Sequence, residues 1–242
     1  MKTVIDAHNI SKTFNPETIP VLAVDKVHLH LERGEFTALV GPSGSGKTTL
    51  LNLIGGLDKP DTGNILINGV DITLLSANAL IDFRLHNIGF VFQSFNLIPV
   101  LTAKENVELI MQLQHSKRAS IEKRVRALFQ EIGLEDKMQT RPAQLSGGQQ
   151  QRVAVARALA PKPQFVLADE PTANLDSKSA ANLLDIMAKL NQEENITFIF
   201  STHDARVIER ARRVITLVDG QIHADTAHVE TNVAHEGFST NK

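Results

Sequence analysis

The chain has 242 residues, of which 42% are hydrophobic and 21% charged, and its formal net charge is −2. This length allows about one large or two small domains with a buried core, and the composition excludes a disordered chain or a disulfide-stapled miniprotein. The absence of cysteine excludes disulfides, thiol nucleophiles and cysteine-ligated zinc. We expect no nucleic-acid partner from this charge. No signal peptide is expected because Asp6 and His8 interrupt the apolar region that one needs, and no membrane helix because no apolar run approaches about 18 residues.

The first clear unit spans residues 35–54, where a short apolar strand, a glycine-rich turn and a helix over Lys47–Ile54 follow one another. The turn reads GPSGSGKT from Gly41 to Thr48 and fits the phosphate-loop pattern G-x-x-x-x-G-K-[ST] in its required place between a strand and a helix. A chance match in a chain of this composition is about 1 in 200 before that context is required. The unit therefore predicts a phosphate site.

Each residue type of this loop suits a triphosphate. Glycines at 44 and 46 leave room for backbone N–H groups to approach the phosphates, and the helix N-terminus adds about half a positive charge. Lys47 supplies a full charge between the β- and γ-phosphates. The Thr48 hydroxyl suits Mg²⁺, which prefers hard oxygen ligands.

Helical patterns without strand signals fill residues 94–150. Two helices are predicted there, the second ending at Gly133, and their apolar faces comprise Val107, Ile110 and Met111 in the first and Ile121, Val125, Leu128, Phe129 and Ile132 in the second. We expect a single domain over 1–225, with an α/β core of about 1–93 and 151–225 and an inserted helical subdomain of about 94–150. A loosely held polar tail is expected over 226–242.

At the end of the helical block, LSGGQ over Leu145–Gln149 precedes a helix predicted from Gln150 to Ala160 and stopped by Pro161. An ordinary helix N-cap explains one serine. Two consecutive glycines at a helix N-terminus, however, favour close approach of another group to the backbone, as an anion would make. This is a second candidate phosphate site.

The second half of the chain returns to an α/β pattern. Strands apolar on both faces and separated by helices predict a mainly parallel sheet covered on both sides. The first strand ends in Asp169 and Glu170, where open α/β sheets form their ligand crevice. We expect Asp169 to hold the Mg²⁺ hydration shell and Glu170 to orient and deprotonate the attacking water. The predicted elements are strands Phe165–Ala168, Ile196–Phe200 and Val214–Val218 and a helix over Ser177–Asn191.

With both phosphate motifs in place, the sequence from about residue 4 to 223 closely resembles the ATP-binding subunit of an ABC transporter. The resemblance implies an α/β fold: a P-loop NTPase (RecA-like) core with a mainly parallel sheet, an N-terminal antiparallel β region and an inserted helical subdomain. It also implies an ATPase that uses Mg²⁺ and forms a homodimer. In that dimer Ser146–Gln149 of one copy covers the γ-phosphate held by the phosphate loop of the other.

The family pattern implies roles for further residues one at a time. Gln93 resembles the glutamine that touches Mg²⁺ and the attacking water, His203 the histidine that contacts the γ-phosphate, and Asp176 a residue of the loop that crosses the dimer interface. Phe14 lies where the family places its adenine-stacking aromatic, and the chain has no Tyr or Trp. A strand-end glutamine, a structural histidine and a core phenylalanine are the ordinary alternatives. The expected catalytic residues are Glu170, His203 and Gln93; the metal-binding residues Thr48, Gln93 and Asp169; and the nucleotide-binding residues Phe14, Gly41, Ser43, Gly44, Ser45, Gly46, Lys47, Thr48, Thr49, Ser146, Gly147, Gly148, Gln149 and Asp176.

Residues Phe92–Pro99, Leu101–Val107 and Ala168–Asp176 resemble the bacterial branch that includes lipoprotein-releasing, macrolide-export and cell-division ATPases. Gln150 departs from it, because glutamate is commoner there. The branch implies a separate integral membrane permease of the FtsX/MacB type, docked near the helices after Gln93, and a peripheral place on the cytoplasmic side of the inner membrane. Two functions stay open: export of a lipoprotein, lipid or drug, and mechanotransmission to an extracytoplasmic hydrolase without transport.

Two basic stretches and the histidines are assigned to the surface. Residues 117–126 are predicted to form a solvated helix face with a Glu122–Arg126 pair, and Arg206, Arg210, Arg212 and Arg213 to lie beside Glu209 on a surface helix. His28 and His30 share a strand face without convincing ligand spacing, so no metal site is expected there.

Overall fold

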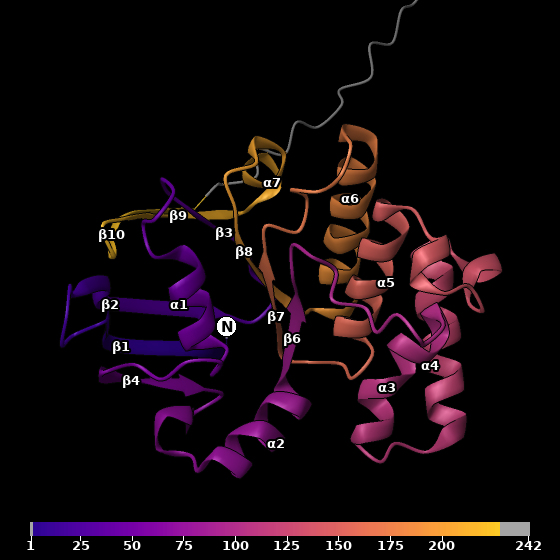
Figure 1. The fold of residues 1–242 in the computed structure, drawn as a ribbon, viewed down its shortest axis with the longest axis horizontal. Coiled ribbons are helices and arrows are strands. Elements are labelled where there is room, and N and C mark those ends of the chain that lie inside the picture. The colour runs from indigo at the N-terminus through magenta and orange to yellow at the C-terminus, as the bar shows by residue number, and fades with distance from the viewer. Residues whose placement is uncertain (1, 228–242) are drawn as a thin grey trace, which may run out of the picture.

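A six-stranded sheet in the order β10-β9-β3-β8-β7-β6 runs through the centre of the computed structural model, which describes residues 2–227 (Figure 1). The pairs β9-β3, β3-β8, β8-β7 and β7-β6 are parallel, and β10 pairs antiparallel with β9. The inner strands are almost wholly buried, as unbroken aromatic and β-branched runs require. The strands are β3 (Phe36–Val40), β6 (Ile88–Val91), β7 (Phe165–Asp169), β8 (Thr197–Ser201), β9 (Arg213–Val218) and β10 (Gln221–Ala227).

A second, antiparallel sheet in the order β2-β1-β4-β5 lies beside the first (Figure 1). The buried apolar residues of β1 and β2 pack with the leucines of α1 in one cluster. The antiparallel sheet therefore covers the helix that follows the phosphate loop. Its elements are β1 (Thr3–Phe14), β2 (Val21–Glu32), β4 (Thr62–Ile67), β5 (Val70–Asp71) and α1 (Lys47–Ile54).

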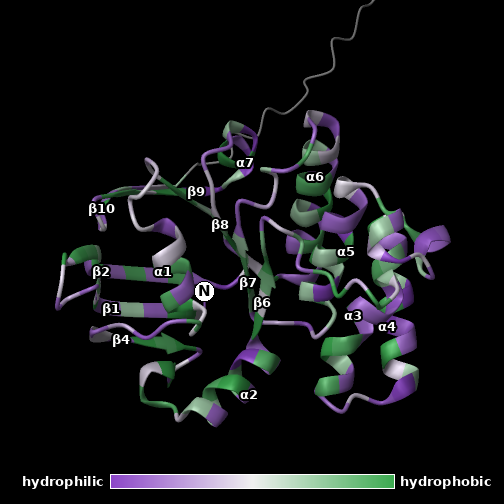
Figure 2. Cartoon of the chain, in the orientation of Figure 1, coloured by the Kyte–Doolittle hydropathy of each residue, from purple (hydrophilic) through white to green (hydrophobic). Residues whose placement is uncertain are grey.

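The helices α5 and α6 pack with the parallel sheet in a second cluster, and α3 and α4 pack against α5 (Figure 1). In Figure 2 the central strands are mostly hydrophobic, whereas many outer turns of the helices are hydrophilic. The helices are α2 (Ala77–Asn87), α3 (Ala103–Leu113), α4 (Arg118–Glu131), α5 (Gly147–Leu159), α6 (Ser177–Glu194) and α7 (Ala205–Arg210), with 3₁₀ turns at Ile72–Leu74, Glu135–Lys137 and Pro142–Gln144.

Most predicted elements are found within a few residues of their expected bounds. The helix predicted over Lys47–Ile54 is α1, whereas the one predicted from Gln150 begins at Gly147. The earlier start has a local cause: the Ser146 hydroxyl accepts from the Gln149 N–H (3.3 Å), and the Gln149 side chain accepts from the Ser146 N–H (2.9 Å). Of the predicted tail, residues 226 and 227 end β10, and residues 228–242 lie outside the described residues.

The ion pair predicted between Glu122 and Arg126 on α4 is wrong. Glu122 pairs with Arg118 (3.2 Å) and not with Arg126. Arg124 is not solvated, because its side chain is 13% exposed and donates to both carboxylate oxygens of Glu194. The prediction failed because Glu194 lies 70 residues away in sequence, at the end of α6.

The second basic stretch does not form one surface helix. Helix α7 ends at Arg210, and Arg213 belongs to β9. There the Arg213 guanidinium donates to Asp225 (2.8 Å) and Glu35 (3.0 Å), and the bond to Asp225 raises the pKa of Arg213 above its ordinary value. Arg213 therefore joins β9 to β10 and to the residue before β3.

Candidate functional site

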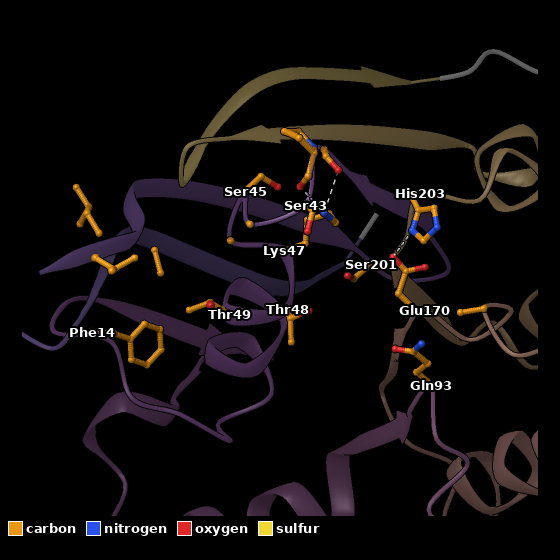
Figure 3. Close-up of a pocket in the computed structure, with 18 residues that line it drawn as sticks. Phe14, Ser43, Ser45, Lys47, Thr48, Thr49, Gln93, Glu170, Ser201 and His203 are labelled. Atoms are coloured by element: carbon orange, nitrogen blue, oxygen red, sulfur yellow. Dashed lines mark hydrogen bonds and ion pairs between the residues drawn. The ribbon is translucent and has the colours of Figure 1, made fainter. Parts of the chain in front are cut away.

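A cleft of about 810 Å³ lies where β3, β7 and β8 end at their carboxyl edge (Figure 3). Loops from distant parts of the sequence meet there, as the parallel topology requires. The lining residues are Phe14, Val21, Leu22, Ala23, residues 41–49, Gln93, Glu170, Ala173, Ser201 and His203. The cleft thus gathers the phosphate loop, the predicted aromatic residue and all three predicted catalytic residues.

Lys47 folds back over the phosphate loop. Its ammonium group donates to the carbonyl oxygens of Gly41 and Pro42, both at 2.9 Å, which leaves the third N–H for another acceptor. The Ser45 hydroxyl of the same loop is buried and has no hydrogen-bond partner within residues 2–227. Buried polar groups nearly always have a partner, so the loop is suited to an added acceptor such as a phosphate oxygen.

The structure gives further reasons for two glycines of the loop. A side chain at Gly46 (φ +99°) would come within 2.1 Å of the Ala23 carbonyl oxygen of β2, so the chain's own backbone requires glycine there. At Gly44 a Cβ would meet nothing within 4 Å, and its φ of +79° is what favours glycine. The prediction that a Cβ would obstruct a phosphate is therefore not needed to explain Gly46.

Thr48 and Asp169 bring hard oxygen donors together. The Thr48 hydroxyl, in the first turn of α1, lies 3.2 Å from each carboxylate oxygen of Asp169 at the end of β7. Thr48 and Gln93 line the cleft, whereas Asp169 lies behind Thr48 and lines a smaller hollow beside it. A hydroxyl, a carboxylate and an amide oxygen are the donor types that suit Mg²⁺, so the set fits the predicted cation.

Glu170 is held in an unusual backbone conformation directly after β7. Its φ is +44°, a left-handed value that costs a non-glycine residue about 1–3 kcal/mol. Its N–H donates to the Ser201 carbonyl oxygen (2.8 Å). Its carboxylate lies 2.8 Å from His203 Nδ1 (Figure 3). It also accepts from the Thr202 hydroxyl (3.3 Å). The surrounding strands therefore point one carboxylate into the cleft, next to the predicted histidine.

The loops that carry Glu170 and His203 are joined by Asp204. This carboxylate accepts from the Thr172 hydroxyl (2.7 Å) and from the Arg206 guanidinium (2.7 Å). The hydrogen bond from Arg206 lowers the pKa of Asp204 to about 2. Asp204 is thus charged at neutral pH and fixes both loops.

This pKa predicts an acid-dependent loss of stability. Because the folded-state pKa of Asp204 is lowered from 3.8 to about 2, its contribution is complete above about pH 4 and is lost as the pH falls towards 2. Asp204→Asn should lower the unfolding free energy by about 1–2 kcal/mol at pH 7. This is less than the full pKa shift would give, because solvent screens the partly exposed Arg206. Urea unfolding of both proteins between pH 7 and 3 measures this. A wild-type advantage that stayed constant down to pH 3 would contradict the assignment.

Phe14 lies at the opposite end of the cleft from Glu170 (Figure 3). Its side chain is 40% exposed at the end of β1, and the Lys12 ammonium lies 5.5 Å from its ring centroid. Lys12 is itself held by Asp58 (3.0 Å) and by the Lys59 carbonyl oxygen (2.8 Å). The ring is therefore supported and open to a flat ligand.

Replacing Phe14 by alanine should weaken ATP binding by about 5- to 150-fold, because base-aromatic stacking is worth ~1–3 kcal/mol. Phe14→Tyr keeps the ring and should bind within about threefold of wild type. Fluorescence titration with a labelled ATP measures both. If the alanine variant and wild type bound ATP with equal affinity, the adenine ring would have to stack on another surface.

Ser146–Gln149 and Asp176 lie outside this cleft. Ser146 caps α5, and Asp176 caps α6 by accepting from the Ser179 N–H (3.0 Å) and hydroxyl (2.6 Å), which lowers the pKa of Asp176. A Cβ at Gly148 would lie 2.9 Å from Ser179, so close packing of α5 on α6 explains that glycine. The two segments lie together, and neither completes the phosphate-loop cleft of its own chain.

Comparison with known proteins decides the family. The model of the ABC transporter family matches residues 24–173, more than half of the chain. The chain belongs to the ABC transporter family. It is 46% identical over 224 residues to the lipoprotein-releasing system ATP-binding protein LolD 1 of Rhodopseudomonas palustris, which covers 92% of this chain and 99% of that protein. The predicted family and branch are confirmed.

The chain is also similar to a fused ATP-binding/permease protein and to two solved dimeric structures. The chain is 44% identical over 223 residues to the macrolide export ATP-binding/permease protein MacB of Brucella melitensis, which covers 92% of this chain but 34% of MacB. Its structure matches a dimeric structure of the ATP-binding cassette MJ0796 of Methanocaldococcus jannaschii with a TM-score of 0.86, 41% identity and coverage of 93% and 99%. A dimeric post-hydrolysis state of MJ0796 bound to ADP and Pi gives a TM-score of 0.85. The predicted P-loop NTPase fold is confirmed.

The fold also bears on membranes. None of the helices within residues 2–227 has both the length and the hydropathy needed to cross a bilayer.

Proposed function

We propose that this ABC family chain is the ATP-hydrolysing subunit of a transporter, in which two copies close head to tail on two ATP molecules and drive a separate membrane permease of the FtsX/MacB type. The observation that carries the proposal is the division of the site. The cleft holds Lys47, Glu170 and His203, whereas Ser146–Gln149 lie elsewhere on the same chain. A second copy supplies the missing half.

Within each composite site the chain's own residues have distinct tasks. The backbone of residues 41–48 and the Lys47 ammonium bind the phosphates, and Phe14 stacks on the adenine. Glu170 accepts a proton from the water that attacks the γ-phosphorus, the bond from that phosphorus to the β,γ-bridging oxygen breaks, and ADP and phosphate are left. Gln93 and His203 orient the water and the phosphate. Thr48, Gln93 and Asp169 would hold Mg²⁺, which would neutralise phosphate charge when bound. The α5 N-terminus after Ser146 faces the partner's nucleotide.

The relatives support a transport role rather than the mechanotransmission alternative, because LolD is named for lipoprotein release and MacB for macrolide export. MacB also combines an ATP-binding part with a permease in one chain, and our chain matches only 34% of it. We place the protein at the cytoplasmic side of the inner membrane, held peripherally through its permease. Affinity purification of the full chain from membranes, followed by identification of the bound proteins, would identify the permease and its cargo.

A cross-linking experiment tests the head-to-tail arrangement directly, since the chain has no cysteine to interfere. Ser43→Cys and Ser146→Cys variants, mixed with Mg-ATP and a short bis-maleimide, should give a cross-linked dimer that requires nucleotide. The control replaces Ser146→Cys by Ser120→Cys, an exposed position on α4. Equal cross-linking of both mixtures, or none of either, would contradict the arrangement.

A further inference from the structure

Gln151 is a fully buried amide in the second turn of α5. Its Nε2 donates to two backbone carbonyl oxygens, those of Phe92 (3.2 Å) and Pro171 (2.8 Å). Its Oε1 has no hydrogen-bond partner within residues 2–227. Because both neighbours are carbonyl oxygens, which only accept, the amide nitrogen must face them. One side chain therefore satisfies two carbonyl groups in the protein interior.

Those two carbonyl groups adjoin the predicted catalytic residues. Phe92 immediately precedes Gln93, and Pro171 immediately follows Glu170. The strands before them, β6 and β7, are parallel neighbours whose last paired residues are Val91 and Ala168. The Gln151 amide thus bridges the segments that follow β6 and β7, just beyond the point where the pairing of these strands ends.

Left-handed backbone conformations occur on both sides of this bridge, although Arg157, and not Gln151, donates to the carbonyl oxygens of Phe95 and Asn96. Glu170 has a φ of +44°, and Phe95 and Asn96, shortly after Gln93, have φ values of +54° and +50°. Such conformations persist only where surrounding contacts over-determine them. On the other side, the Asn174 side chain donates to the Gln93 carbonyl oxygen (3.0 Å).

We propose that Gln151 is a positioning residue that sets the separation of Gln93 and Glu170, and so aligns water and base for ATP hydrolysis. The inference rests on the proposed ATPase function and adds a role for a residue outside the cleft. Because Gln151 sits on the helix that begins after Ser146, it also connects the half-site offered to the partner with the catalytic residues of its own chain. A shift of about 1 Å in such groups lowers a rate by about 100-fold.

The test replaces Gln151 by methionine, which has a similar length but no N–H donor. We expect kcat for ATP hydrolysis to fall by about 10- to 100-fold. The dissociation constant of ATP should stay within about threefold, because Lys47 and Phe14 are untouched. A kcat within twofold of wild type would overturn the proposal, as would loss of ATP binding in step with kcat.

Asn191 offers a matched control for the loss of a buried amide. It is 2% exposed on α6, and its Nδ2 donates to the carbonyl oxygens of Gly34 (3.0 Å), Glu35 (3.3 Å) and Ile196, away from the cleft. Asn191→Leu should lower Tm at least as much as Gln151→Met, while its kcat stays within about threefold of wild type. Equal losses of kcat in both variants would reduce Gln151 to a stabilising residue and overturn its positioning role.

A double mutant separates positioning from general damage. If Gln151 acts through Glu170, then Gln151→Met should add less than about threefold to the loss already caused by Glu170→Gln. If the kcat losses of the two single variants multiplied in the double variant, the idea that Gln151 acts through Glu170 would be contradicted. Wild-type protein without ATP turnover would overturn the proposed function and this inference together, whereas active wild type with a normal Gln151→Met variant would overturn only the inference.

Discussion

Replacing Glu170 by glutamine is expected to lower kcat for ATP hydrolysis by about 10²- to 10⁴-fold, the usual contribution of a general base. The amide has nearly the shape of the carboxylate but cannot take a proton. The contacts of Lys47 and Phe14 are unchanged, so ATP should still bind with a dissociation constant within about threefold of wild type. Because hydrolysis reopens the composite site in the proposed cycle, the variant should accumulate as an ATP-bound dimer.

Single-turnover kinetics and small-angle scattering with saturating Mg-ATP measure both effects. Glu209→Gln is the matched control, because Glu209 is exposed on α7 and its replacement changes the net charge by the same amount. It should turn over ATP at the wild-type rate and return to monomers. Near-normal turnover by Glu170→Gln would move the base to another residue, and a solely monomeric variant would contradict the head-to-tail dimer.

Lys47→Ala is expected to weaken ATP binding by at least about 100-fold. The ammonium already bonds to the Gly41 and Pro42 carbonyl oxygens, so it is pre-positioned at the loop and pays little entropy when a phosphate arrives. Each charge-assisted hydrogen bond is worth ~1.5–3 kcal/mol, and removal of the side chain also leaves those carbonyl groups without their donor.

Calorimetric titration with Mg-ATP measures the loss, and Lys123→Ala, an exposed position on α4, controls for the change of net charge. The control should bind ATP as wild type does. Thermal unfolding without nucleotide should change by only a few degrees for either variant, because Lys47 lies at the edge of a cleft. Tight ATP binding by Lys47→Ala would place the nucleotide elsewhere.

Much of the fold follows from local patterns. The phosphate-loop motif predicts α1 at Lys47–Ile54 because strand, turn and helix signals coincide there. The unbroken apolar runs predict the parallel strands because burial on both faces leaves no alternation. Apolar periodicity predicts the start of α5 three residues late because it begins after the cap, whereas the Ser146–Gln149 capping box fixes the first turn.

Other features of the site depend on contacts between distant residues. A glutamine at position 151 reads as a solvated helix residue, and only the packing of α5 against β6 and β7 shows that it is buried beside Glu170. The left-handed φ of Glu170 has no signal in a residue type that avoids it. The local pattern places Arg124 in solvent because its partner, Glu194, lies 70 residues away in sequence, at the end of α6.

The contact between Gly46 and β2 has a consequence for truncation. The Ala23 carbonyl oxygen occupies the space where a side chain at position 46 would lie, so the antiparallel sheet forms the rear wall of the phosphate loop. A shortened protein beginning near residue 34 would keep every residue of the loop motif but lose this wall, along with the ring of Phe14. Such a fragment would retain the sequence signature of a nucleotide-binding protein without the shape that the signature stands for.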